Sequence, residues 1–481
     1  MENIQDVIIV GAGLSGIDAA YRIQSECPTK SYTILEARES MGGTWDLFKY
    51  PGIRSDSDMY TLGFPFYPWK DPKAIADGPD ILSYIKETAA HFGIDKKILY
   101  QNKVLKASWS LEEKLWTLTI EGNEQLALQT MKCKFLFMTS GYYNYEQGYA
   151  PSFPKSELFQ GPIIHPQKWD TSLDYSNKEI VVIGSGATAV TLVPELAKKA
   201  SKVTMLQRSP TYIMTLPSKD VVANTLRKIL PSKIAYNIIK WKNVLLAMFM
   251  YNLSKWKPQV MKDFLMKGVH RALKTAAMDE HFSPKYNPWD QRLCFVPDGD
   301  FFKAIKHKKA DIVTDTIKEF THNGILLDSG KELKADIVIS ATGLQLQLLG
   351  GMTIDLDGEK VIPKNLHSYK GVMLSDIPNF AFAVGYTNAS WTLKSDLNCQ
   401  FVTRIINFMD KENKSVVVPR FNANKFDSEP LLDFDAGYVK RAEEFLPKQG
   451  SKKPWKVHQN YIKDTISLKL DKINNENLEF S

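Results

Sequence analysis

The sequence has little cysteine and no long apolar run. Its four cysteines, Cys27, Cys133, Cys294 and Cys399, are scattered, with no Cys-x-x-Cys pair. This spacing argues against a disulfide framework and a zinc site, and it is typical of reduced thiols in a cytoplasmic protein. The apolar run nearest to a membrane span, residues 244–251, is far shorter than the roughly 18 to 20 residues that cross a bilayer. No membrane span and no bound metal are therefore expected.

The sequence also lacks a large excess of either charge and a secretion signal. Its net charge is +7 over 481 residues. That value permits an anionic cofactor or a membrane surface as partner but does not indicate nucleic acid. The first residues, Met-Glu-Asn-Ile-Gln-Asp, include no basic stretch, so secretion is not expected and a cytoplasmic location is. The length and the 44% hydrophobic content allow two or three domains.

Two segments share one pattern and predict two nucleotide-binding units. Residues 7–10 and 180–183 are continuous apolar runs, typical of strands buried on both faces. Each is followed at once by a glycine turn and a helical stretch, as at the start of a βαβ unit. Two more apolar runs, 135–138 and 335–339, end in small-residue turns and mark where the chain passes between the units. We therefore expect an α/β protein with two Rossmann-like domains, the second inserted into the first.

The first glycine turn has the form Gly-x-Gly-x-x-Gly and predicts FAD binding. Gly11 allows a tight turn, Gly13 lets the backbone approach a pyrophosphate, and Gly16 lets helix and strand pack closely. Ser15 lies in the same turn. The next strand is followed by Glu36, 23 residues past Gly13, where a carboxylate can accept both ribose hydroxyls.

The second turn predicts NADPH binding. Its third glycine is replaced by Ala189, and the next strand ends without a carboxylate that would repel a 2′-phosphate. Arg208, 22 residues past Gly186, can pair with that phosphate instead. The residues expected to contact NADPH are Ile183, Gly184, Ser185, Gly186, Ala187, Thr188, Ala189, Gln207 and Arg208.

These motifs divide the chain into four parts. We expect the first part of the FAD-binding domain at 1–150, a linker at 151–175, the NADP-binding domain at 176–340, and the second part of the FAD-binding domain with a C-terminal tail at 341–481.

A helical excursion is expected within the NADP-binding domain at about 217–280. Between Lys219 and Lys274 it has twelve Lys and Arg against two Asp, interleaved with tryptophans. This pattern leaves open a peripheral membrane contact, although a solvated face over core aromatics is the more common arrangement. The tail from about Lys448 is expected to be basic and irregular.

The linker has the pattern Phe-x-Gly-x-x-x-His-x-x-x-Trp-Asp, which runs from Phe159 to Asp170 and includes His165 and Trp169. With the FAD–linker–NADPH order, which covers nearly the whole chain, it resembles the fingerprint of type I Baeyer–Villiger monooxygenases. The resemblance implies an NADPH- and O2-dependent flavoenzyme that oxidises apolar ketones to esters or lactones through a flavin C4a-peroxide. Relatives that hydroxylate nitrogen or sulfur usually have Tyr or Phe in place of Trp169.

The same resemblance implies roles for further residues. Arg292 would stabilise the reactive oxygen anion, and Asp56 would position the Arg292 side chain. Arg54 and Ser55, together with Asp56, would contact the cofactors. His165 would couple domain motion to cofactor placement. The FAD-wrapping segment would be Gly43, Thr44, Trp45, Asp46 and Leu47, and Val104 would hold the adenine. Gln291 stands where most relatives have a lysine, which leaves more of the 2′-phosphate contact to Arg208.

Other functions stay open to different degrees. A monooxygenase that hydroxylates nitrogen or sulfur fits the same fold, and S-oxidation of sulfides or thioamides is expected as an added activity. A disulfide reductase is excluded because none of the cysteines has a close partner in the sequence. A non-catalytic dinucleotide-sensing protein would share the fold but has no need of Arg292 and Asp56. The substrate itself does not follow from the sequence.

Overall fold

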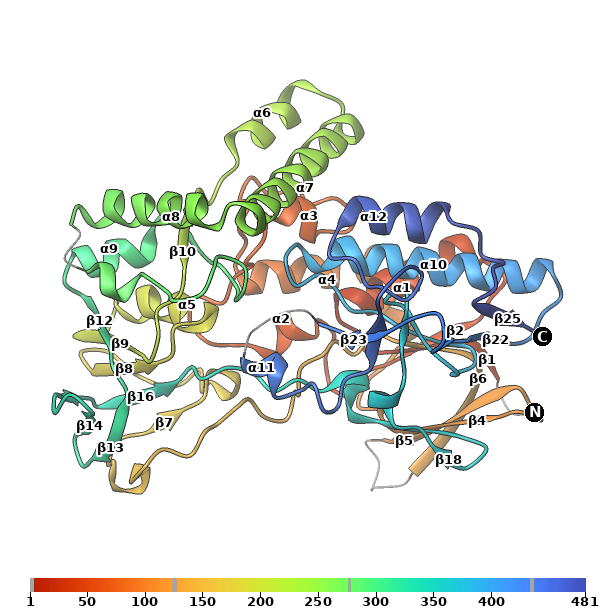
Figure 1. Cartoon of the computed structure of the whole chain (residues 1–481), viewed down its shortest axis with the longest axis horizontal. Helices are drawn as coiled ribbons and strands as arrows, with labels where there is room; N and C mark the ends of the chain where they lie inside the picture. Colours follow the sequence, from red (N-terminus) through yellow and green to blue (C-terminus); the bar gives the residue numbers. More distant parts are fainter. Residues whose placement is uncertain (1–3, 123–127, 276–277, 433–436) are drawn as a thin grey trace.

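The computed structural model describes residues 4–122, 128–275, 278–432 and 437–481, and its two α/β halves lie side by side (Figure 1). The first sheet is mixed, and its central strand β1 pairs in parallel with β2 and β6. In sheet order its strands are β18 (Glu359–Lys360), β17 (Thr353–Leu356), β4 (Lys103–Ser110), β5 (Leu115–Glu121), β6 (Leu128–Met138), β1 (Gln5–Val10), β2 (Tyr32–Leu35) and β3 (Ile98–Leu99), with β21 (Phe380–Phe382) also on β6.

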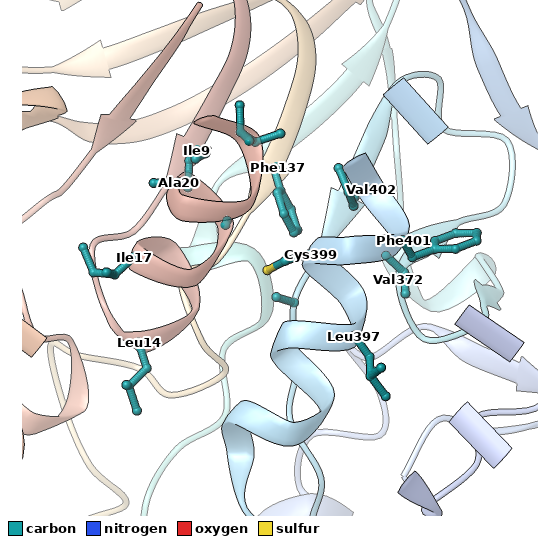
Figure 2. Close-up of a cluster of buried hydrophobic side chains, with 14 of the residues drawn as sticks. Ile9, Leu14, Ile17, Ala20, Phe137, Val372, Leu397, Cys399, Phe401 and Val402 are labelled. Carbon is teal, nitrogen blue, oxygen red and sulfur yellow. The ribbon is translucent and has the colours of Figure 1, made fainter. Parts of the chain in front are cut away.

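The core of this half lies between the sheet and two helices. Helix α1 (Leu14–Glu26) follows β1, and α10 (Trp391–Lys411) packs beside it although it lies far along the chain. Figure 2 shows Cys399 of α10 among apolar side chains of α1 and β6, including Phe137. Because α1 starts directly after a strand buried on both faces, its N-terminus is held at the carboxyl edge of the sheet.

The second sheet is parallel and is built around β8. Its order is β12 (Ala310–Thr314), β9 (Lys202–Gln207), β8 (Glu179–Ile183), β16 (Ile337–Ser340) and β7 (Ile163–Ile164), with helices α5 (Ala187–Leu196) and α9 (Asp300–Lys306) packed on it. Strand β7 belongs to the linker and pairs with β16. The linker therefore contributes an edge strand to the second domain, which its mixed sequence did not indicate.

The chain returns to the first sheet after β16. Strands β17, β18 and β21 and helix α10 all follow the second sheet in sequence but pack in the first half. The expected fold class is confirmed: two Rossmann-like units, the first discontinuous and the second inserted into it.

The excursion consists of helices α6 (Val221–Ile229), α7 (Ser232–Trp256) and α8 (Pro258–Leu273). Helix α8 packs on α9 and on β10 (Ile213–Leu216), in the second half. Helix α7 instead crosses to the first half, where Val244 joins the core. The excursion therefore bridges both halves. Within the described residues, no helix has the length and apolarity that crossing a bilayer requires.

The tail is ordered, so the expected irregular structure was wrong. It contains α12 (Tyr461–Thr465), a π-helical turn η7 (Ile466–Leu470), and β25 (Leu478–Phe480), which pairs with β22 (Val417–Pro419). Trp455 is fully buried and donates its Nε1–H to Asn477 Oδ1 at 3.2 Å. Single apolar residues spaced among lysines hold this segment, and such sparse spacing gives no periodic signal.

The remaining α-helices and strands are short, except α4, which packs in the core of the first half. They are α2 (Thr44–Leu47), α3 (Met59–Leu62), α4 (Gly78–His91), α11 (Gly437–Lys440), β11 (Cys294–Pro297), β13 (Ile317–Thr321), β14 (Gly324–Leu327), β15 (Glu332–Lys334), β19 (Ser368–Tyr369), β20 (Met373–Leu374), β23 (Ser428–Pro430) and β24 (Lys448–Gly450).

Candidate functional site

A cavity of about 1190 Å³ lies where the two halves meet. Its walls include residues that directly follow the parallel strands β1, β2, β6, β8, β9 and β16. Ligands of open α/β sheets bind outside the carboxyl ends of the strands. The volume exceeds the roughly 300 to 1000 Å³ of a pocket for one drug-sized ligand, and both glycine turns contribute to it.

The first and third glycines of the first turn leave no room for a side chain. Gly11 has φ +105°, and a Cβ on Gly16 would lie 1.9 Å from the carbonyl oxygen of Gly11. Gly13 is the N-cap of α1 and offers no side-chain cap, so the first N–H groups of the helix, those of Leu14 and Ser15, can donate to a ligand in the cavity. Ser15 also lines the cavity. Gly16 acts behind it, as a packing residue.

Glu36 lies in the cavity wall directly after β2. It is buried and accepts the backbone N–H of Ala12 at 2.7 Å and that of Arg38 at 3.0 Å. Burial raises the pKa of this carboxyl, while the two backbone hydrogen bonds oppose the rise. Val104, on β4, lines the same part of the cavity.

The Gly-Gly-Thr-Trp segment packs backbone to backbone on the first turn. A Cβ on Gly43 would lie 3.0 Å from the Cα of Gly13. Gly43, Thr44 and Trp45 line the cavity. Asp46 and Leu47 stand outside the lining: Asp46 pairs with Arg38 at 2.7 Å, and Leu47 packs on the core of the second half.

The second glycine turn is tightly packed at its first glycine and open at its second. Gly184 has φ +133°, and its Cβ would meet the carbonyl oxygen of Ala341 at 2.3 Å. A Cβ on Gly186 would have no described atom within 4 Å, so the backbone there is accessible to a phosphate. Four neighbours of these glycines also line the cavity: Ile183, Ser185, Ala187 and Thr188. Ala189 is fully buried beneath them.

Arg208 follows β9 and lines the cavity, with its side chain in an exposed position. The residue before it is turned inward. Gln207 donates its Nε2–H to the carbonyl of His281 at 2.9 Å and to Thr314 Oγ1 at 2.8 Å. Of these two sequence-predicted residues, Arg208 can therefore reach a cofactor and Gln207 supports the strand end.

Arg292 and Asp56 meet in the cavity wall. The Arg292 Nη2 lies 2.5 Å from the Asp56 Oδ2, and both side chains are partly exposed to the cavity. They come from opposite halves of the molecule, Asp56 from the loop after Pro51 and Arg292 from the segment before β11. A fixed cation is thus positioned at the junction of the two domains.

The residues before Asp56 also join the domains. Arg54 forms an ion pair with Asp300, at the start of α9, with Nη1 and Oδ2 2.5 Å apart. The Arg54 side chain is only 8% exposed. Ser55 is buried, and its Oγ accepts the N–H of Ala76 at 3.1 Å. Arg54 and Ser55 line the cavity together with Asp56.

His165 lies beside the cavity and ties the linker to the chain that leaves β16. Its Nε2–H donates to the carbonyl of Gly343 at 3.1 Å, and its Nδ1 accepts the N–H of Gln167 at 3.2 Å. Burial lowers the pKa of His165 and favours this neutral form. Trp169 packs edge-on against Tyr175, at 6.3 Å, and lies outside the cavity lining.

Much of the remaining cavity wall is aromatic, and the sequence assigned these aromatic residues no role. Tyr142 stacks on Trp391 at 5.1 Å between ring centres, and Trp391 donates its Nε1–H to Ser15 Oγ at 2.8 Å. Burial raises the pKa of Tyr142, and that of Tyr145 to about 12, so both phenols stay neutral near pH 7. Three tyrosines among residues 142–145, shortly after the end of the buried strand β6, were the available signal.

The site as a whole fits two dinucleotides. Two glycine turns open two helices at one cavity, Glu36 stands beside the first and Arg208 beside the second. No group of His, Cys, Asp and Glu among the described residues has a metal-binding arrangement, and the four cysteines are free and buried.

Comparison with known proteins points to one family. The model of the flavin-binding monooxygenase-like family matches residues 4–411. The chain is 54% identical to FAD-containing monooxygenase EthA of Mycobacterium tuberculosis over 99% of this chain and 97% of that protein. It is 47% identical to the probable FAD-binding monooxygenase AlmA of an Acinetobacter species, over 100% and 97%.

Solved structures share the fold at low identity. A crystal structure of OTEMO with FAD and NADP matches with a TM-score of 0.78 and 20% identity, over 100% of both chains. An oxidized steroid monooxygenase bound to NADP matches with a TM-score of 0.72 and 20% identity, over 87% of this chain and 88% of that one.

Proposed function

The chain belongs to the flavin-binding monooxygenase-like family, and on this premise we propose that it is an FAD- and NADPH-dependent enzyme that uses O2 to oxidise apolar ketones to esters or lactones. The observation that carries the proposal is the Arg292–Asp56 pair, which lies in the same cavity as both glycine turns. A protein that only senses dinucleotides would have no need for a cation held there.

The two cofactors would be bound by different halves of the molecule. The first turn, Glu36 and the segment from Gly43 to Trp45 would hold FAD, and the second turn with Arg208 would hold NADPH. Bound together, the cofactors would supply hydride transfer and activation of oxygen at the flavin. Tyr142 and Trp391 would exclude water from the reacting end.

Arg292 would supply the charge that the reaction requires. Guanidinium stays protonated and planar, so it can stabilise negative charge that develops on oxygen. Asp56, 2.5 Å away, would hold its orientation. His165 would act as a positioning residue, because both of its ring nitrogens are engaged by the backbone and it joins the linker to the chain that returns to the first half.

Oxidation of sulfur is the second candidate activity. Trp169, on which the expected preference for ketones rests, lies outside the cavity lining and packs against Tyr175. It would therefore not contact a substrate in the cavity, and sulfides and thioamides would be oxidised beside ketones.

NADPH consumption over a panel of ketones and sulfides, with identification of products, tests the proposal. Esters or lactones formed in step with NADPH support the ketone activity, and sulfoxides alone would assign the enzyme to sulfur. NADPH oxidation that yields only hydrogen peroxide with every substrate would contradict both.

We further propose that the enzyme works in the cytoplasm at a membrane surface. The support is the exposed apolar face of the helical excursion.

A further inference from the structure

The excursion and the tail expose an unusual number of large apolar side chains. More than half of those exposed in the described residues lie between 221 and 264, and three more lie on α12 and η7. Trp256 is 77% exposed, Leu470 72% and Phe249 60%. Scattered apolar residues are normal on a protein surface, but a concentration of this kind marks a binding surface. We call the surface formed by the exposed apolar residues of 221–264, α12 and η7 the helical face.

Helix α7 is apolar on two sides, and only one of them is covered. Ala235, Ile239 and Val244 are buried against the rest of the molecule. Ile234, Ile238, Trp241, Leu245 and Phe249 are exposed, and they follow one another at intervals of three and four residues. A surface helix normally turns a polar side to water. This stripe of α7 therefore lacks a covering layer among the described residues.

The exposed stripes of neighbouring helices continue that of α7. The ring of Trp241 lies 5.7 Å from that of Tyr461 on α12. Ile462 of α12 and Ile466 at the start of η7 are exposed one turn apart. Figure 1 shows α6, α7, α8 and α12 along one edge of the molecule. The helical face is thus built from the inserted domain and the C-terminal segment together.

The helical segment that forms most of this face carries an excess of positive charge. Residues 219–274 carry a net charge of +10, whereas the whole chain carries +7, so the remainder is net negative. Lys228, Lys233 and Lys257 are exposed among the apolar side chains. The Lys257 Nζ lies 4.7 Å above the ring of Trp256, at the corner between α7 and α8.

We propose that the helical face binds the surface of an anionic lipid bilayer. Tryptophan, long aliphatic residues and lysine on one face are the combination that lies in the headgroup region, apolar side chains inward and bases at the phosphates. A second copy is the weaker candidate, because a twofold interface would set this positive face against itself.

Helix α7 also contacts two loops that contribute to the cavity wall, so the inference deepens the proposed function and in this respect rests on it. Asn243 of α7 donates to Asp58 Oδ1 at 2.8 Å, two residues after Asp56. Lys255 pairs with Asp290 at 2.9 Å, two residues before Arg292. An apolar substrate dissolved in the bilayer would reach the molecule next to these loops.

Flotation of the full-length, FAD-loaded protein with lipid vesicles tests the proposal. We expect binding to phosphatidylcholine vesicles that contain about 30 mol% phosphatidylglycerol, and weaker binding to phosphatidylcholine alone. The triple variant Leu245→Ser/Phe249→Ser/Trp256→Ser should bind the anionic vesicles at least about tenfold more weakly than the wild type. The matched control Leu111→Ser/Leu128→Ser, which changes residues 65% and 63% exposed elsewhere, should bind as the wild type does. The charge variant Lys228→Glu/Lys233→Glu/Lys257→Glu should lose only the preference for anionic vesicles.

Equal binding by the wild type and the triple variant, or no flotation of the wild type, would overturn the proposal. If the wild type is a dimer and the triple variant is a monomer, the helical face binds a second copy of the chain and not a bilayer. NADPH oxidation with a water-soluble ketone, measured on the same preparations, should be equal in all of them. Its absence from every preparation would count against the proposed function and leave the flotation result intact.

Discussion

At the scale of single residues, the most informative contact is the one between Arg292 and Asp56. The two are 236 positions apart and come from different halves, so no local spacing predicts their 2.5 Å pair. Only the family resemblance placed them together. Glu36 and Arg208, in contrast, follow strands at fixed distances from glycine turns, and their positions could be read from the sequence.

Arg292→Ala should uncouple the enzyme. Without the cation, charge that develops on oxygen is unsupported, and we expect product formation to fall about 100-fold, or about 3 kcal/mol of transition-state stabilisation. The ratio of ester to NADPH consumed is the measurement, with hydrogen peroxide as the complementary product. Asp56→Asn should show a smaller loss of the same kind. Coupled turnover near the wild-type rate in Arg292→Ala would remove the residue from the mechanism.

Arg208→Ala should weaken the choice of NADPH over NADH. A guanidinium–phosphate pair in a partly wet cleft contributes a few kcal/mol at most. We therefore expect the KM for NADPH to rise about tenfold or more and that for NADH to stay unchanged. Lys202→Ala is the control, since Lys202 starts the same strand and is 52% exposed, away from the cavity. Equal changes in the KM for NADPH and for NADH would show that Arg208 does not bind the 2′-phosphate.

At the scale of elements, the strand–turn–helix units were predictable and the short or sparse elements were not. A buried apolar run followed by glycines specifies β1 and α1 locally. Strand β7 has only two residues, and it is a strand because β16 offers it an edge. The tail is held by isolated contacts such as that of Trp455, which are visible only in three dimensions.

The third glycine of the first turn and the second glycine of the second turn give a paired test, because one packs helix on strand and the other leaves its backbone accessible. A methyl group at Gly16 would lie 1.9 Å from a backbone oxygen, so Gly16→Ala should separate α1 from its strand, release FAD and destabilise the fold by about 1 to 3 kcal/mol. Gly186→Ala meets no described atom within 4 Å and should fold normally, with an increased KM for NADPH. Flavin content, thermal unfolding and NADPH kinetics distinguish the two outcomes. Loss of stability in Gly186→Ala would contradict this assignment.

At the scale of the whole molecule, the two halves are joined by more than the linker. The fold class followed from the repeated turn and from the two small-residue crossings, which the sheets place as expected. The sequence did not indicate that α7 crosses from the inserted domain to the first, or that Arg54 reaches Asp300. These ties depend on how two separately predictable units pack, and no pattern within either unit encodes that packing.

The pair of Arg54 with Asp300 should control how the halves close around NADPH. Asp300→Asn keeps the size of the side chain but leaves the Arg54 charge, which is only 8% exposed, without its partner. Because Asp300 starts α9 in the second half and Arg54 lies two residues before Asp56, the variant should loosen the junction while each half stays folded. We expect kcat/KM for NADPH to fall about three- to tenfold, with FAD content unchanged. Small-angle scattering with NADP⁺ bound should show a larger radius of gyration than in the wild type. Asp311→Asn, on β12 and 46% exposed, is the matched control. Unchanged scattering and kinetics in Asp300→Asn would mean that the Arg54–Asp300 pair does not set the arrangement of the domains.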